Sequence, residues 1–236
     1  YSKLQMEPGR KQVLIADGYH IDPGCDHQRP FSPPRLDVLQ RAWFDRWLKG
    51  IENGVDNYGP VTLEQQGGGW SCGPSFPRQE VAPRRLFLTE EPTGTAMHTQ
   101  HDGSLRSTPA ARRRSLRIRP SLRGFASRDL SQVTAGLGIV LGEKFSTDSR
   151  YQEGTGLSFT SEPVSRRTQL SGEMNLRLNV STTAHEGIWA VTVNDVAPDG
   201  TSTVLTNGAL TASNRALDPS RSTYDEDGVL LDEGKP

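Results

Sequence analysis

The sequence predicts a mainly β chain, in which a β-sandwich or jelly roll follows the last strand, loop and helix of an α/β domain. Only 33% of the 236 residues are hydrophobic, and Gly and Pro are plentiful at 24 and 16 residues. This composition favours strands and loops over helices. Apolar residues recur with a helical period once, near residues 33–49, and with a period of two at several places beyond residue 60. Many short strands separated by turns are typical of sandwiches and jelly rolls.

The first fifty residues predict a strand, a long loop and a helix. An apolar run, Val13-Leu14-Ile15-Ala16, predicts the strand. A loop rich in Pro and Gly follows and carries His20. Loops at the carboxyl edge of a sheet often hold reactive side chains, because the rigid scaffold positions them. The order of strand, histidine loop and closing helix therefore makes His20 a candidate general base.

The helix predicted at residues 33–49 is strongly amphipathic. Gly50 suits its C-terminal cap, and Asp37–Arg41 and Asp45–Lys49 are i,i+4 ion pairs in the favourable order, each worth ~0.3 kcal/mol. We expect its apolar face to cover a sheet. That face is formed by Leu36, Leu39, Trp43, Phe44, Trp47 and Leu48.

The remainder of the chain is predicted to be β. The composition of residues 50–60, with Asn53-Gly54 and Gly59-Pro60, indicates a linker, so we expect two domains, residues 1–59 and residues 60–236. Residues 174–180 alternate as a strand with one wet face, and residues 188–193 are apolar enough on both sides to be a central strand. Pro198-Asp199-Gly200 turns the chain into a hairpin with residues 203–206. Weaker strand candidates are residues 61–65, 85–89, 136–141 and 157–160. The polar, acidic tail, residues 218–236, does not resemble a closing strand.

Charge and composition exclude several classes of partner. The net charge of −1 gives no global field towards nucleic acid or an anionic membrane, so we expect neither as a partner. No apolar run approaches membrane-spanning length. No cofactor is expected. Cys25 and Cys72 are the two cysteines. Two cysteines are too few for a disulfide framework, although they could form a single bridge. The compartment stays undetermined.

Several segments together resemble the cocaine esterase and X-Pro dipeptidyl-peptidase family of serine hydrolases. The resemblance is scattered over residues 13–217, and the order and spacing of the segments carry it. They are the strand with His20; Leu39-Gln-Arg-Ala-Trp-Phe-Asp-Arg-Trp-Leu-Lys-Gly50 with Asn53-Gly-Val55; Gly69-Trp70 with Ser75-Phe-Pro77; Arg85-Leu-Phe-Leu88; Gly103-Ser-Leu105; Ser171-Gly172; Asp195-Val-Ala-Pro-Asp-Gly200; Leu205-Thr206; Gly208; and Ala212-Ser-Asn-Arg-Ala-Leu217.

This resemblance implies an α/β-hydrolase catalytic domain followed by a C-terminal jelly roll. The family's triad runs Ser, Asp, His in chain order, and His20 matches its histidine. The serine and aspartate would then lie upstream, in the remainder of a parent α/β-hydrolase domain. The expected chain is the C-terminal portion of an enzyme that cleaves a small ester, amide or X-Pro peptide, inactive by itself and truncated at both ends. Exposed apolar surface would follow, and with it a tendency to form oligomers or aggregates.

Other residues match catalytic or binding patterns less well. Gly69-Trp-Ser-Cys-Gly73 spells G-x-S-x-G, but Pro74 and Pro77 follow it where a nucleophile needs a helix, so we do not expect Ser71 to be a nucleophile. A metal cluster formed by His20, Asp22, Cys25, Asp26 and His27 has suitable residue types without a standard spacing. His98, His101 and Asp102 are expected to be loop residues without scaffolding. The basic run at residues 112–119 lacks aromatic residues, so a solvated loop or strand face is the better interpretation.

Two alternatives to an enzyme portion remain open at this point. A jelly roll can be an autonomous carbohydrate- or partner-binding module, and His20 and the Trp-rich helix would then serve packing alone. The sandwich could also be a purely structural part of a larger assembly.

Overall fold

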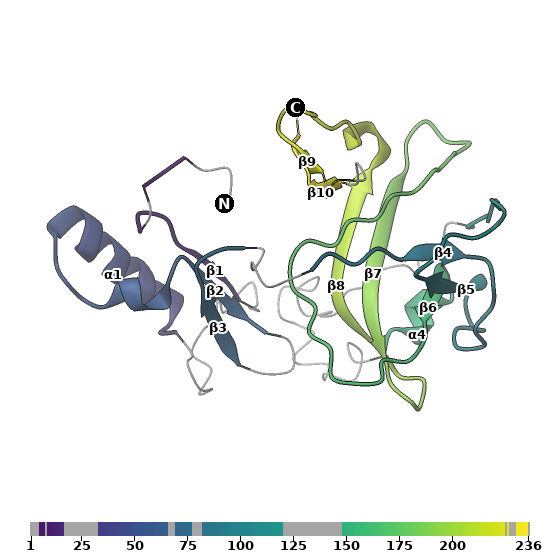
Figure 1. Cartoon of the computed structure of the whole chain (residues 1–236), viewed down its shortest axis with the longest axis horizontal. Helices are drawn as coiled ribbons and strands as arrows, with labels where there is room; N and C mark the ends of the chain where they lie inside the picture. The colour runs from purple at the N-terminus through teal and green to yellow at the C-terminus, as the bar shows by residue number, and fades with distance from the viewer. Residues whose placement is uncertain are drawn as a thin grey trace. The chain divides into compact units, whose positions relative to one another are not determined.

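The computed structural model describes residues 5–7, 9–16, 33–65, 69–76, 82–119, 148–224, 226 and 230–235. Within them the chain is mainly β, as the sequence predicts (Figure 1). Its contacts form two compact units. Unit 1 comprises Tyr1–Val81 with Ser131–Leu141, and unit 2 comprises Ala82–Leu130 with Gly142–Pro236. The predicted domain boundary at residues 59 and 60 stays a prediction.

Unit 1 contains a three-stranded sheet in the order β1-β2-β3. Strand β1 (Val13–Ile15) runs parallel to β2 (Val61–Glu64), which pairs in antiparallel fashion with β3 (Trp70–Gly73). Val61 and Trp70 are buried in it. The apolar run at residues 13–16 and the candidate at residues 61–65 are thus confirmed as strands.

The predicted helix is confirmed as α1 (Leu36–Lys49). It ends at Gly50, which adopts a φ of 70° and donates its N–H to the Asp45 carbonyl. Lys49 Nζ lies 2.6 Å from Asp45 Oδ1, as predicted. Asp37 pairs instead with Arg35, at 3.2 Å. The apolar face is only partly covered within the described residues, since Phe44 and Leu48 are 57% and 76% exposed.

The stretch expected to be a linker is an ordered part of unit 1. It contains the 3-10 helix η1 (Val55–Tyr58), whose Val55 side chain is buried. Gln12 Nε2 donates to the Val55 carbonyl at 3.1 Å, and Asn53 Nδ2 donates to the Ala42 carbonyl at 2.7 Å. Glycines at residues 54 and 59 turn the chain, and one buried valine and these hydrogen bonds hold it in place. The domain boundary inferred from this stretch stays a prediction.

A second three-stranded sheet, β4-β5-β6, lies in unit 2. Strand β5 (His101–Arg106) is central, antiparallel to β4 (Phe87–Thr89) and parallel to β6 (Leu157–Ser161). The predictions at residues 85–89 and 157–160 are confirmed with shifted ends. Strand β5 has no period-two apolar pattern, and the sequence analysis did not predict it.

Among the described residues of unit 2, the predicted hairpin is the longest β element. It comprises β7 (Ile188–Val196) and β8 (Ser202–Thr211), joined by a turn in which Gly200 has a φ of 84°. The expected central position of β7 is not met in the part of the chain that the structure describes, where β7 pairs with β8 alone and Ile188 is 72% exposed. A one-turn helix, α4 (Arg150–Glu153), lies near the turn end of this hairpin (Figure 1).

Residues 174–180 do not form the predicted strand. Their alternating apolar side chains are 40–48% exposed, and no described strand pairs with this segment. A period-two pattern forms a strand only where a partner offers backbone groups and an apolar surface. The apolar side chains are Met174, Leu176, Leu178 and Val180.

The tail forms a small ribbon that the sequence analysis did not predict. A 3-10 helix, η3 (Ala212–Asn214), follows β8, and the short strands β9 (Thr223–Tyr224) and β10 (Leu230–Asp232) pair in antiparallel fashion. The strand candidate at residues 136–141 lies outside the described residues. None of the described helices has the length and apolar character needed to span a membrane.

Candidate functional site

A polar cluster surrounds the carboxylate of Glu153 at the end of α4. Ser149 Oγ and Asn194 Nδ2 donate to Glu153 Oε1 at 2.9 and 2.8 Å, and Ser202 Oγ donates to the same oxygen. His98 Nε2 lies 2.7 Å from Glu153 Oε2. These five residues are called the Glu153 cluster below.

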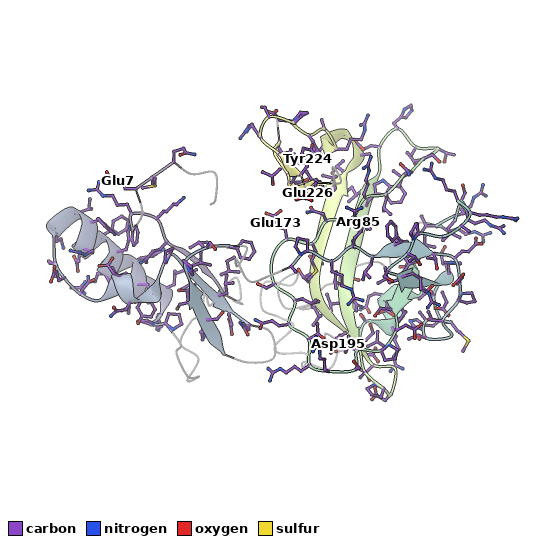
Figure 2. All side chains as sticks on the ribbon, in the orientation of Figure 1. Glu7, Arg85, Glu173, Asp195, Tyr224 and Glu226 are labelled. Atoms are coloured by element: carbon purple, nitrogen blue, oxygen red, sulfur yellow. The ribbon has the colours of Figure 1, made fainter. Side chains whose placement is uncertain are left out.

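Four separate segments contribute to the Glu153 cluster. Ser149 and Glu153 are four residues apart, which places both on one face of the α4 turn. Asn194 and Ser202 come from β7 and β8, at the end of the hairpin where Figure 2 labels Asp195. His98 precedes β5. Because Ser149 and Ser202 are buried and the Glu153 side chain is only 15% exposed, these polar groups need the partners they have in each other.

The cluster stabilises the charged form of Glu153. Burial raises the pKa of this carboxyl, but hydrogen bonds from Ser202, His98 and Ser149 outweigh burial and lower the pKa below its ordinary value of 4.5. Glu153 is therefore a carboxylate at neutral pH, and it accepts hydrogen bonds through both oxygens.

The order of groups in the cluster differs from that of a hydrolytic triad. In a triad the histidine lies between the serine and the carboxylate, so that it can take the serine proton. Here the carboxylate lies between the two serines and His98, and the serine hydroxyls donate to Glu153. Glu153 therefore cannot activate either serine through the imidazole of His98. The cluster instead joins the elements that contribute its residues.

An ion pair flanks the cluster on its exposed side. Arg150 Nε donates to both oxygens of Asp148, at 3.0 and 2.9 Å. This hydrogen bonding lowers the pKa of Asp148 from 3.8 to about 2, against the opposing effect of burial. Asp148 Oδ1 also accepts the N–H of Ser202 at 3.4 Å, so the pair helps to hold α4 on the hairpin.

His20, the predicted catalytic residue, lies outside the described residues, and its role stays a prediction. Asp22, Cys25, Asp26 and His27, considered with His20 as a metal site, also lie outside the described residues. Among the residues that the structure does describe, no group of His, Cys, Asp and Glu is arranged to hold a metal ion.

Ser71 lies within a strand, where a nucleophile elbow is not possible. It is part of β3, opposite Leu63 of β2, and its hydroxyl accepts a hydrogen bond from Gln65 Nε2 at 3.0 Å. A G-x-S-x-G nucleophile needs a sharp turn between a strand and a helix. Cys72 beside it is a free, exposed cysteine.

His98, His101 and Asp102 do not converge on a common site. His101 and Asp102 belong to β5, so the expectation that they lie in a loop is wrong for these two. Asp102 accepts hydrogen bonds from Thr93 Oγ1 and the Gly94 N–H at 2.9 and 2.6 Å, which stabilise the preceding turn. The His101 ring lies 6.0 Å from that of Phe159, and only His98 joins the Glu153 cluster.

The basic run at residues 112–119 is exposed and has no helix or strand. Arg114 Nε forms an ion pair with Glu90 at 3.0 Å. The backbone of Arg119 exchanges two hydrogen bonds with the side chain of Gln100, at 2.9 and 3.0 Å. These features agree with the interpretation as a solvated loop.

A match to a known protein family shows to which family the chain belongs. The family model of the X-Pro dipeptidyl-peptidase C-terminal non-catalytic domain matches residues 53–232. The chain belongs to this family. The resemblance inferred from scattered segments is thus confirmed, including its placement at the C-terminal side of such enzymes. No curated protein and no solved structure matches the chain.

Membership of a non-catalytic domain family agrees with the geometry of the Glu153 cluster. This cluster was not predicted from the sequence, apart from His98, which was grouped with His101 and Asp102. No local signal could have revealed it, because its members are spread from residue 98 to residue 202 and meet only when α4 contacts both the β7–β8 hairpin and the segment before β5.

Proposed function

We propose that this chain supplies the C-terminal portion of a serine hydrolase of the ester, amide or X-Pro dipeptidyl-peptidase type. The observation that carries the proposal is the family match over residues 53–232. The order of β1, His20 and helix α1 along the chain, just before the matched region, supports it, because α/β enzymes hold reactive residues between a strand and the helix that follows it.

In this proposal His20 is the general base of the hydrolase. Its neutral imidazole accepts the proton of a serine nucleophile and then donates a proton to the leaving group. The serine, and the aspartate that orients the imidazole, come from the remainder of the parent α/β-hydrolase domain. The substrate is a small ester, amide or peptide, and the chain alone is inactive.

The jelly-roll portion, in the same proposal, packs on the catalytic domain and helps to wall the acyl pocket. The exposed side chains of Phe44 and Leu48 on α1 support a docking role for the helix, because large apolar residues on one helix face normally meet a partner.

The test uses His20→Ala, with His27→Ala seven residues further along the chain as a matched control. The isolated chain is expected to show no turnover of an activated ester. In the full-length parent, His20→Ala should lower kcat by at least about a thousandfold, and His27→Ala should leave it near the unmutated value. The upstream reading frame should encode G-x-S-x-G between a strand and a helix, followed by an aspartate. Turnover by the isolated chain that survives His20→Ala would contradict the assignment.

The description of the family domain as non-catalytic favours a second function, a β-sandwich module that binds carbohydrate or a protein partner. In that case His20 has no chemical role. A glycan array probed with the whole chain separates the two functions. Saturable binding that is unchanged in His20→Ala supports the binding module, and absence of binding together with loss of parental activity in His20→Ala supports the hydrolase.

A further inference from the structure

Helix α4 and its flanks connect two sheets of unit 2. On one side, the N–H of Ser149 donates to the Ser202 carbonyl of the hairpin at 2.8 Å. On the other side, the N–H of Gln100, just before β5, donates to the Gly156 carbonyl at 2.9 Å, and Gln100 Nε2 donates to the Thr155 carbonyl at 2.8 Å. The segment at residues 148–156 therefore holds contacts to both the hairpin and the β4-β5-β6 sheet.

Glu153 joins both sides through one side chain. Its Oε1 accepts from Ser202 of β8 and Asn194 of β7, while its Oε2 contacts His98 before β5. We propose that the Glu153 carboxylate is an acid-sensitive latch, which holds the β4-β5-β6 side of unit 2 to the β7–β8 hairpin and is released when the carboxylate is protonated. The proposal does not depend on the role of His20.

The groups around Glu153 favour its ionised form on each side, through hydrogen bonds and through the charge of Arg150. His98 approaches from the segment before β5, and Arg150 approaches from α4 itself. The strands β7 and β8 present the neutral groups of Asn194 and Ser202. Two further carboxylates, Asp148 and Asp199, lie near Arg150. The guanidinium of Arg150 offsets their negative charge, because it donates hydrogen bonds to Asp148 and is attracted by Asp199.

Protonation weakens these contacts, because it removes the negative charge that strengthens the hydrogen bonds to Glu153. Three donors already point at Glu153 Oε1, and the amide of Asn194 can present its Nδ2 hydrogens there only to an acceptor. When Glu153 is protonated, its carboxyl carries a hydrogen of its own among these donors. It also loses the negative charge that strengthens its contact with His98. Because hydrogen bonds to a charged group are the stronger ones, the junction should be weakened more than most surface contacts at acid pH.

The direction of the pH dependence follows from the lowered pKa of Glu153. A carboxyl whose pKa is lower in the folded state stabilises that state at pH values above its ordinary pKa. The stabilisation is lost as the pH falls through the folded-state value. The latch is therefore closed at neutral pH and opens in acid.

Hydrogen exchange followed by mass spectrometry tests the latch on the whole chain. Protection factors, corrected for intrinsic exchange, are compared between about pH 7 and about pH 3. We expect protection of residues 149–156 and 96–101 to fall at least about tenfold, as for the loss of one charged hydrogen bond. Strands β2 and β3, in unit 1, serve as the internal reference.

The decisive variant is Glu153→Gln, with Glu162→Gln as its matched control. Glu162 forms an ion pair with Arg106 at 2.7 Å, but its side chain is 76% exposed. Glu153→Gln should show low protection at both pH values, and Glu162→Gln should behave like the unmutated chain. If Glu153→Gln does not fold, His98→Gln replaces it. This variant should lose protection at residues 96–101, while the protection of residues 149–156 should still fall between the two pH values. The proposal would be overturned if the protection of the unmutated chain were the same at both pH values. It would also be overturned if protection still fell in acid in Glu153→Gln.

Discussion

Gly103 of β5 and Phe159 of β6 are register partners, and the phenyl ring fills the space beside the glycine. A Cβ at residue 103 would lie 2.6 Å from Phe159 Cδ1 and 2.5 Å from the Thr89 carbonyl oxygen. No side-chain atom fits there without movement of the strand backbone. The central position of β5 thus depends on the absence of a side chain at this residue.

Gly103→Ala should therefore destabilise unit 2. We expect a loss of about 1–3 kcal/mol in the free energy of unfolding, as for other overpacked sites, measured by chemical denaturation. Gly208→Ala is the control, because it also lies in a strand and a Cβ there meets nothing within 4 Å. That change should be neutral or stabilise by about 0.5 kcal/mol. Equal stability of the two variants would show that the strand yields to the added methyl group.

Thr89 and Ser104 form a buried hydrogen bond between β4 and β5. Their hydroxyl oxygens lie 2.6 Å apart, and both residues are almost fully buried. Thr89→Val or Ser104→Ala alone should cost about 1–3 kcal/mol of unfolding free energy. Ser104→Ala leaves the buried Thr89 hydroxyl without this bond, and Thr89→Val leaves Ser104 Oγ with only the bond from Arg106 Nε. The double variant should cost less than the sum, and a double-mutant cycle measures the difference. Strict additivity would mean that the two hydroxyls do not depend on each other.

Asp148 should titrate at an unusually low pH. Hydrogen bonds from Arg150 lower its pKa from 3.8 to about 2. Its contribution to stability is accordingly complete above the ordinary value of 3.8 and is lost as the pH falls towards about 2. Carboxyl carbon shifts in an NMR titration report the midpoint, and Arg150→Met should move it back up towards 3.8. A midpoint near 3.8 in the unmutated chain would contradict the strength of this pair.

Phe44 and Leu48 should promote self-association of the isolated chain. They are 57% and 76% exposed on α1, and large exposed apolar groups favour association. Phe44→Gln with Leu48→Gln, which preserves helix propensity, should lower the sedimentation coefficient at high concentration. Val38→Gln is the control, since Val38 is also exposed but points to a different side of the helix. A clean, cooperatively melting monomer before any substitution would argue against the prediction.

For some elements of this fold, the local sequence pattern was enough to predict the element. The apolar stripe and Gly50 predicted α1 to within a few residues, and Pro198-Asp199-Gly200 between two β-rich runs predicted the β7–β8 hairpin. These elements make most of their hydrogen bonds with residues close in sequence, so their signals lie side by side along the chain. Segments spaced along the chain likewise indicated the family.

Other features depended on partners far away in sequence. Residues 174–180 have the alternation of a strand without a described strand to pair with, whereas β5 lacks the alternation and is central because β4 and β6 flank it. Glu153 would be an ordinary helix-end carboxylate if His98, Asn194 and Ser202 did not surround it. The amino-acid order alone determined the helix, the hairpin, the β-rich class and the family. Tertiary structure decided which strands pair and which polar groups are buried together, because pairing and desolvation arise only when segments separated by tens of residues come into contact.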